Sequence, residues 1–456
     1  MSGGNQVWLL ENQVWLLELT ARRRHHISPD ELYDPYDPAV FVQSGHQRYD
    51  FMKALNIADY RLLAKKRLPK GLFEYVDRGT EDEIGLRSIR NVLNETKLRQ
   101  KLLNDVSAPD TSVTVFGDTL PMPLIISPTA AAGLMWHDGE VQLARAACSA
   151  GIPFCIASQS MTSMEEIADR ADGANLWFQL YVFEDRDFTR ELIHRARALG
   201  IKNLLFTADT PRSPKKEWNV RNGYGIPIRP TVTGALDLIS HPRWTISVML
   251  RYLLTSGMPT YAHYPPEFRT KVTRPSVAKN VKLARKLTWG DFEETRRLWD
   301  GNLVLKGVLD RQDAELALSA GADGIIVSCH GGRNLDSAPV AIEVLPEIAD
   351  AVGSKLTVLA DSGIRRGSDV AKYLAAGAEA VLVGRAPLYG TAAEGERGAR
   401  AVLEILREEL DHCMAFTGQA RASDIDRSLF WQSIINTPPQ TDADLLTNDR
   451  IAALRV

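Results

Sequence analysis

Residues 302–330 read NLVLKGVLDRQDAELALSAGADGIIVSCH. Two short apolar runs, Asn302 to Val308 and Asp323 to Cys329, flank a segment from Asp313 to Ala320 that has the spacing of an amphipathic helix. Runs that are apolar along their whole length are typical of strands buried on both faces of a parallel sheet. This stretch therefore predicts a strand, a covering helix and a second, parallel strand.

The same alternation extends over most of the chain. Helical segments such as Asp138 to Ala150 separate further apolar runs. Eight strand–helix units favour a closed (β/α)8 TIM barrel over an open sheet. The eight predicted strands are residues 123–129, 153–158, 176–181, 203–209, 302–308, 323–329, 356–362 and 380–385.

The length of 456 residues exceeds the roughly 250 that such a barrel needs. We assign the surplus to additions around one barrel domain at residues 51–418. Residues 1–50, which contain NQVWLLE twice, form an extension that we expect to be poorly ordered. A helical extension covers residues 51–105, a long insertion after strand four covers about 211–287, and residues 419–456 form a C-terminal tail.

The composition excludes several classes of protein. Lys plus Arg is 54 and Asp plus Glu is 57, so the net charge of −3 provides no field that would attract nucleic acid. The four cysteines contain no CxxC pair, which indicates neither a zinc site nor a disulfide framework. We therefore expect no metal and a reducing, cytoplasmic compartment. No apolar run reaches the roughly 18 residues of a membrane span.

Polar residues gather where the predicted strands end, which is where TIM barrels carry their chemistry. Among them, His330 is followed by two glycines that allow a ligand to approach the backbone. Arg333 carries a fork suited to a carboxylate. A base beside such a clamp fits an anionic substrate that must lose a proton, and Asp209 at the end of strand four could orient the imidazole. The other strand-end residues are Gln179, Tyr181, Thr207, Lys306, Ser328, Asp361, Gly384 and Arg385.

The last two strands predict a phosphate site. Residues 361–365 read DSGIR, and Gly384-Arg385 follows strand eight. Loops at these two positions form the usual phosphate site of TIM barrels, with backbone N–H groups and arginines as donors. Lys306 points towards the same mouth, where a buried lysine needs an anionic partner, such as a cofactor ring that gains negative charge on reduction.

These residues carry a resemblance to the FMN-dependent 2-hydroxy acid oxidase and dehydrogenase family, from about Asp59 to Gly418. The shared motifs are LPKGLFEY (68–75), SPTA (127–130), FQLY (178–181), TADTPR (207–212), LKGV (305–308), SCHGGRNLD (328–336), DSGIRRGSDV (361–370) and VGR (383–385).

The resemblance implies FMN as cofactor, oxidation of an L-2-hydroxy acid to the 2-oxo acid, and roles for individual residues. His330 would be the base, with Asp209 behind it. Tyr181 would bind the substrate oxygens, and Arg333 and Tyr75 the carboxylate. The residues implied to contact the isoalloxazine or ribityl groups are Pro128, Thr129, Ala130, Gln179, Thr207, Lys306 and Ser328. Those implied to hold the phosphate are Asp361, Ser362, Gly363, Ile364, Arg365, Gly384 and Arg385.

Three positions depart from the family pattern. Lys216 stands where the family has a second substrate-binding arginine, so the charge remains but the bidentate fork is lost. Cys329 replaces the asparagine of SNHGG, and Ala157 replaces a flavin-binding serine, with Ser158 adjacent.

The favoured substrate is bulky and mandelate-like. L-lactate, or a non-carboxylate alcohol accepted because of Lys216, are the alternatives, while a flavin-dependent isomerase and a non-catalytic barrel are competing hypotheses.

The electron acceptor and the partners are less constrained by the sequence. The motifs at 241–259, 361–370 and 384–390 are most similar to mandelate dehydrogenases, whereas Ala130 is more typical of oxidases, which leaves a quinone-type acceptor and O2 both open. The insertion has an amphipathic patch at residues 244–254. In membrane-associated members this loop is the attachment segment, so residues 230–260 predict peripheral contact with the inner face of the cell membrane. A lid or a subunit contact is the alternative, and the resemblance implies a homotetramer.

Overall fold

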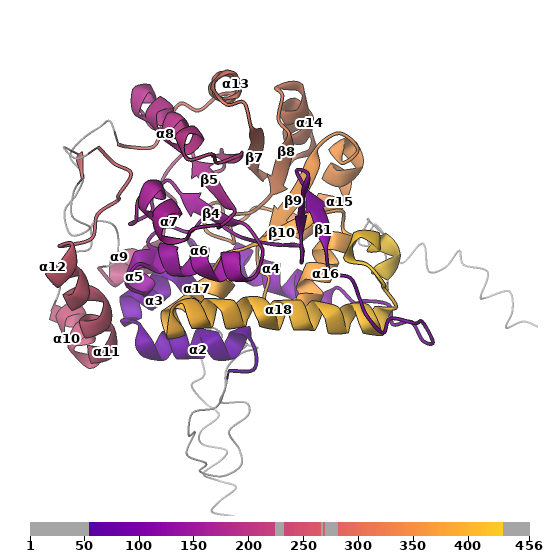
Figure 1. Ribbon diagram of the computed structural model, residues 1–456, viewed down its shortest axis with the longest axis horizontal. Coiled ribbons are helices and arrows are strands. Elements are labelled where there is room, and N and C mark those ends of the chain that lie inside the picture. Colours follow the sequence, from indigo (N-terminus) through magenta and orange to yellow (C-terminus); the bar gives the residue numbers. More distant parts are fainter. Residues whose placement is uncertain (1–53, 224–231, 266–267, 270–280, 432–456) are drawn as a thin grey trace, which may run out of the picture. The chain divides into compact units, whose positions relative to one another are not determined.

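The computed structural model describes residues 54–223, 232–265, 268–269 and 281–431 (Figure 1). The predicted extension at residues 1–50, including its repeat, lies outside the described residues. Parts of the predicted insertion and of the predicted C-terminal tail also lie outside them.

Eight parallel strands form a closed barrel in the order β10-β3-β4-β5-β6-β7-β8-β9. Each predicted apolar run contains one of these strands, so the predicted (β/α)8 barrel is confirmed. Nearly every strand residue is buried, because strand side chains face either the barrel interior or the surrounding helices. The bounds are β3 Leu124–Ile126, β4 Phe154–Ala157, β5 Leu176–Leu180, β6 Asn203–Thr207, β7 Asn302–Val308, β8 Gly324–Val327, β9 Thr357–Asp361 and β10 Ala380–Val383.

Helices connect successive strands and cover the outside of the barrel. Between β7 and β8, for example, the Asp310 side chain caps a helix by accepting from the backbone N of Gln312, and the helix buries Ala314 and Ala317. The covering helices are α5 Ala132–Met135, α6 Gly139–Ser149, α7 Met164–Arg170, α8 Arg186–Ala198, α13 Trp289–Leu298, α14 Arg311–Ser319, α15 Ala341–Val352, α16 Gly367–Ala375, α17 Arg385–Glu394 and α18 Glu396–Thr417.

From residue 54 onward, three helices precede the barrel: α2 Ile57–Arg67, α3 Lys70–Asp77 and α4 Ile84–Glu95. The predicted helical extension is correct for these residues, but no helix follows Glu95 before the barrel. A hairpin of β1 Val113–Val115 and β2 Asp118–Leu120 lies there, which the sequence did not predict, because three-residue strands are too short to show a period. Its Phe116 packs against Trp177 at a ring separation of 5.8 Å and lies over Gly324, at the amino-terminal end of the barrel strands.

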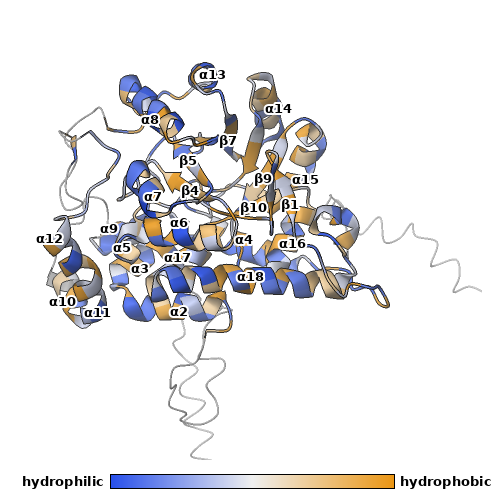
Figure 2. Cartoon of the chain, in the orientation of Figure 1, coloured by the Kyte–Doolittle hydropathy of each residue, from blue (hydrophilic) through white to orange (hydrophobic). Residues whose placement is uncertain are grey.

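The insertion after β6 contains α9 Glu217–Arg221, α10 Val232–Ser240, α11 Pro242–Trp244, the π-helical turn η3 Thr245–Leu250 and α12 Arg251–Thr255. Trp244, Val248 and Tyr252, spaced four residues apart, are buried, and the indole of Trp244 donates to the carbonyl of Leu134 at 2.7 Å. Figure 2 shows hydrophobic and hydrophilic residues mixed around α10, α11 and α12. None of the helices in the described ranges is long and apolar enough to cross a membrane. From α10 to α12, the exposed large apolar residues are Leu236, Ile239, Ile246, Leu250, Leu253 and Leu254.

Candidate active site

The carboxyl-terminal ends of the barrel strands surround one pocket, which α3 and the start of α9 complete. Most residues singled out in the sequence line it, although they come from every part of the barrel. Asp209 and Ser328 are not among the lining residues and lie behind His330 and Lys306 instead. The predicted residues that line the pocket are Tyr75, Pro128, Thr129, Ala130, Gln179, Tyr181, Thr207, Lys216, Lys306, His330, Arg333, Asp361, Ser362, Gly363, Ile364, Arg365, Gly384 and Arg385.

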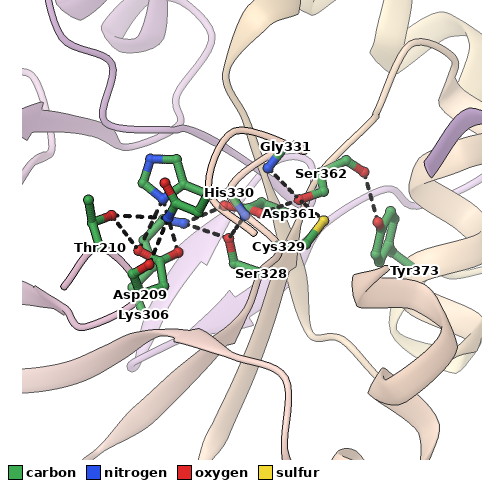
Figure 3. Close-up of polar contacts among 11 residues, drawn as sticks. Asp209, Thr210, Lys306, Ser328, Cys329, His330, Gly331, Asp361, Ser362 and Tyr373 are labelled. Atoms are coloured by element: carbon green, nitrogen blue, oxygen red, sulfur yellow. Dashed lines mark hydrogen bonds and ion pairs between the residues drawn. The ribbon is translucent and has the colours of Figure 1, made fainter. Parts of the chain in front are cut away.

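The structure brings His330 and Asp209 together although 121 positions separate them (Figure 3). Nδ1 of His330 lies 2.9 Å from Oδ2 and 3.1 Å from Oδ1 of Asp209. Burial alone would raise the pKa of Asp209, but the neighbouring His330 and Lys306 outweigh burial and leave that pKa below its usual value. An ionised carboxylate only accepts hydrogen bonds, so Nδ1 carries a proton, and in the neutral imidazole the free lone pair is then on Nε2.

The backbone around this pair is shaped to hold it. His330 has a φ of +53°, in the left-handed region. Gly307 has a φ of +107°, and a Cβ there would lie only 2.4 Å from Cβ of Asp209, so glycine is needed for Asp209 to lie against β7. Thr210 donates to Asp209 Oδ1 at 3.0 Å, and Asn334 donates to the Asp209 carbonyl at 2.8 Å. The sequence motifs contained Thr210 and Asn334, but their supporting contacts were not predicted.

Lys306 is buried and has its anionic partner within the protein. Its Nζ donates to Oδ2 of Asp361 at 2.7 Å and to Oγ of Ser328 at 2.8 Å. Burial lowers the pKa of this lysine, but Asp361 and Asp209 outweigh that effect and hold the pKa above its usual value. Lys306 therefore stays charged beside the pocket.

Lys216, Arg333 and Arg385 gather positive charge at another part of the pocket. Arg333 and Arg385 both donate to the carbonyls of Val76 and Arg78 at the end of α3. Burial lowers the pKa of Lys216 well below its usual value, with Arg333 and Arg385 adding repulsion, and burial with Arg333 lowers the pKa of Arg385 to about 10. Asp361 is the one acid among the described residues that line the pocket, and it is bound to Lys306. Such a group of cations favours an anionic ligand.

Unpartnered polar atoms mark where a polar ligand fits. Thr129 Oγ1, Gln179 Nε2 and Thr207 Oγ1 are buried and have no hydrogen-bond partner among the described residues. All three side chains line the pocket, and a buried polar group without a partner costs free energy unless a ligand satisfies it. Position 384 has room for a ligand to approach, because a Cβ added there would meet nothing closer than 3.7 Å.

Ser158 does not replace the serine that is missing at Ala157. Its Oγ donates to the carbonyl of Gln179 at 2.7 Å and accepts from the backbone N of Tyr181 at 3.0 Å. Its backbone N donates to Oε1 of Gln179 at 3.2 Å, which orients the amide and leaves Nε2 unpartnered. Ala157 lines the pocket, so Ser158 supports Gln179 from behind.

The chain is similar to known dehydrogenases over most of its length. Residues 64–432 match the family model described as FMN-dependent dehydrogenase. The chain is 40% identical over 386 residues to an L-lactate dehydrogenase of Pseudomonas syringae pv. syringae (strain B728a), covering 83% of this chain and 98% of that protein. It is 39% identical over 363 residues to an (S)-mandelate dehydrogenase of Pseudomonas putida, covering 80% and 90%. A crystal structure described as the monotopic membrane protein (S)-mandelate dehydrogenase matches with a TM-score of 0.78 at 36% identity, covering 84% of this chain and 100% of that one.

Proposed function

The chain belongs to the FMN-dependent dehydrogenase family, and from this premise we propose that it oxidises an L-2-hydroxy acid to the corresponding 2-oxo acid. It is an oxidoreductase that acts on CH–OH groups, with FMN as its cofactor. The observation that carries the proposal is that His330, held from behind by Asp209, lines one pocket with the cations Lys216 and Arg333. A base beside positive charge suits an anionic substrate that must lose a proton.

His330 acts as the base in this proposal. Nδ1 is held by Asp209, so Nε2 accepts the proton that the substrate loses, and the carboxylate stabilises the imidazolium that results. FMN, when bound, would supply the acceptor for the two electrons and for the second hydrogen that leave the substrate. Burial and the nearby Asp209 raise the pKa of Tyr181, which keeps its phenol protonated and able to donate a hydrogen bond to a substrate oxygen.

Arg333, Lys216 and Tyr75 recognise the substrate carboxylate. The guanidinium of Arg333 lies 5.6 Å from the centre of the Tyr75 ring, so the two side chains support each other. Burial and the two arginines lower the pKa of Lys216, and a bound carboxylate would favour the charged form of this lysine.

The unpartnered atoms of Thr129, Gln179 and Thr207 would satisfy the isoalloxazine and ribityl groups of FMN, with Pro128 and Ala130 beside them. The phosphate would lie against the backbone and arginines of the two last barrel loops, Gly363, Ile364, Arg365, Gly384 and Arg385. Asp361 and Ser328 hold Lys306. A carboxylate would repel a phosphate, so we assign Asp361 to Lys306 instead.

We favour a bulky, mandelate-like hydroxy acid, with L-lactate or a non-carboxylate alcohol as the alternatives. The similarity to mandelate and lactate dehydrogenases supports these two acids, and Lys216 in place of the forked arginine supports the non-carboxylate alternative.

The acceptor in the proposal is a quinone or O2. The exposed apolar residues within 230–260, and the likeness to a protein described as monotopic, support peripheral attachment to the inner face of the cell membrane. We also propose a homotetramer.

The test is anaerobic mixing of purified holoenzyme with (S)-mandelate, L-lactate and a matched alcohol that lacks the carboxylate. The proposal predicts that the flavin absorbance bleaches with at least one of the two acids and more slowly with the alcohol. Bleaching by the alcohol alone would favour the non-carboxylate alternative, and no bleaching by any of them would contradict the function. Re-oxidation of the bleached enzyme by O2 or by a quinone then identifies the acceptor.

A further inference from the structure

Ser362 follows β9 directly, and its hydroxyl makes three hydrogen bonds (Figure 3). Oγ accepts from the backbone N of Gly331 at 3.1 Å and from Sγ of Cys329 at 3.2 Å. It donates to Oδ1 of Asp361 at 2.8 Å. A hydroxyl has one proton to donate and two lone pairs, so the side chain of Ser362 is fully used within the protein. It is not available to a cofactor phosphate.

Through these bonds, Lys306 is connected to the loop that carries His330 by two separate routes. Lys306 reaches the loop of His330 by one route through Ser328, whose Oγ accepts from Lys306 Nζ at 2.8 Å and from the backbone N of His330 at 3.1 Å. The second route runs from Lys306 to Asp361 at 2.7 Å and through Ser362 to the residue after His330. The loop that carries the base is thus bound twice to one buried lysine.

The backbone at this position does not favour serine. Ser362 has a φ of +92°, in the range where glycine is preferred, and the hydroxyl of Tyr373 holds its carbonyl at 2.7 Å. A strained residue persists where the surroundings over-determine it, and such strain gathers at functional sites. A glycine would relax the backbone, so the three side-chain bonds are what serine adds.

We propose that Ser362 is a positioning residue that couples the loop of His330 to the charge of Lys306 and thereby sets the reduction potential of bound FMN. The inference rests on the proposed function in one respect, which is that Lys306 faces the bound FMN. The hydrogen bond from Ser362 disperses part of the negative charge on Asp361. Without that bond, Asp361 would offset more of the positive charge of Lys306, and the electron-rich reduced flavin would be stabilised less.

The test is the midpoint potential of the holoenzyme, measured by anaerobic reductive titration against a reference dye. Both S362A and S362G are expected to weaken the two-electron reduction of FMN by about tenfold, which corresponds to a fall of about 30 mV. C329A is the matched control, because it removes one donor to Ser362 but keeps the bond to Asp361, so its shift should be smaller. Flavin reduction by substrate should slow in S362A and S362G, with KM unchanged.

The two Ser362 variants separate the hydroxyl from backbone strain. S362G removes both, and it carries the test if S362A fails to fold. If S362G has the wild-type potential, the proposal is wrong whatever S362A shows. A shift seen only in S362A would then come from backbone strain and not from the loss of the hydroxyl. The titration needs no hydroxy acid, so a wild-type enzyme that no hydroxy acid reduces would contradict the proposed function and leave this test intact.

Discussion

The base and the cations of this pocket are held in different ways. At the base, His330 is bound to Asp209, which is itself held by Thr210. At the cations, Lys216 and Arg333 have no acidic partner among the described lining residues, and their positive charges repel each other. The protein therefore provides the hydrogen-bond partner of the base before any ligand binds. The two cations, by contrast, receive an anionic partner only when a ligand binds. Pre-organisation serves catalysis, and unmet charge serves recognition.

The largest expected effect comes from removing the base. H330A should keep FMN and lose more than about two orders of magnitude in the rate of flavin reduction, the scale of a lost general base. Stopped-flow absorbance under anaerobic conditions measures this rate, and the flavin spectrum reports cofactor content. Near-normal reduction in H330A would contradict the assignment of His330.

D209N tests whether the carboxylate behind His330 contributes through its charge. The amide can still accept from Nδ1 but does not stabilise an imidazolium. A hydrogen bond to a charged group contributes about 1.5–3 kcal/mol, so we expect flavin reduction to slow by about 10- to 100-fold. KM for the substrate should change little, because Asp209 does not line the pocket. A rise in KM with an unchanged rate would place Asp209 in recognition instead.

The sequence predicted the barrel better than it predicted these contacts. Continuous apolar runs revealed all eight strands, because strands buried on both faces need such runs. The hairpin with Phe116 was missed, since its short strands contain polar residues and form no continuous apolar run. The partner of Lys306 was expected to be a cofactor, but the structure adds Asp361, 55 residues away. A pattern along the chain does not report which strand ends converge, and the hydrogen bonds of Ser362 and Ser158 depend on that convergence.

The role of the cations in substrate binding can be tested by placing a forked guanidinium at position 216. K216R should lower KM for a carboxylate substrate by about 3- to 10-fold, since one further hydrogen bond contributes about 0.5–1.5 kcal/mol. K215R is the matched control, because Lys215 is exposed and paired with Glu217 at 2.9 Å. KM values that stay unchanged for every acid tested would remove Lys216 from recognition.

The smallest expected effect is a pH dependence of ligand affinity that arises from Lys216. Burial and the two neighbouring arginines lower the pKa of this lysine, so the free amine loses its proton at a lower pH than an ordinary lysine does. A bound carboxylate favours the ammonium form and raises that pKa again. Between the two values binding takes up a proton, and the Kd of a 2-oxo acid should rise with pH.

Calorimetry in two buffers of different ionisation enthalpy measures this proton uptake directly. A 2-oxo acid is the appropriate ligand, because it binds without turnover and so separates affinity from the proton transfer at His330. In K216R the guanidinium stays protonated through this range, so both the uptake and the rise in Kd should disappear. If the uptake persists in K216R, the titrating group is another one, and the unmet charge that distinguishes the cations from the base does not include Lys216.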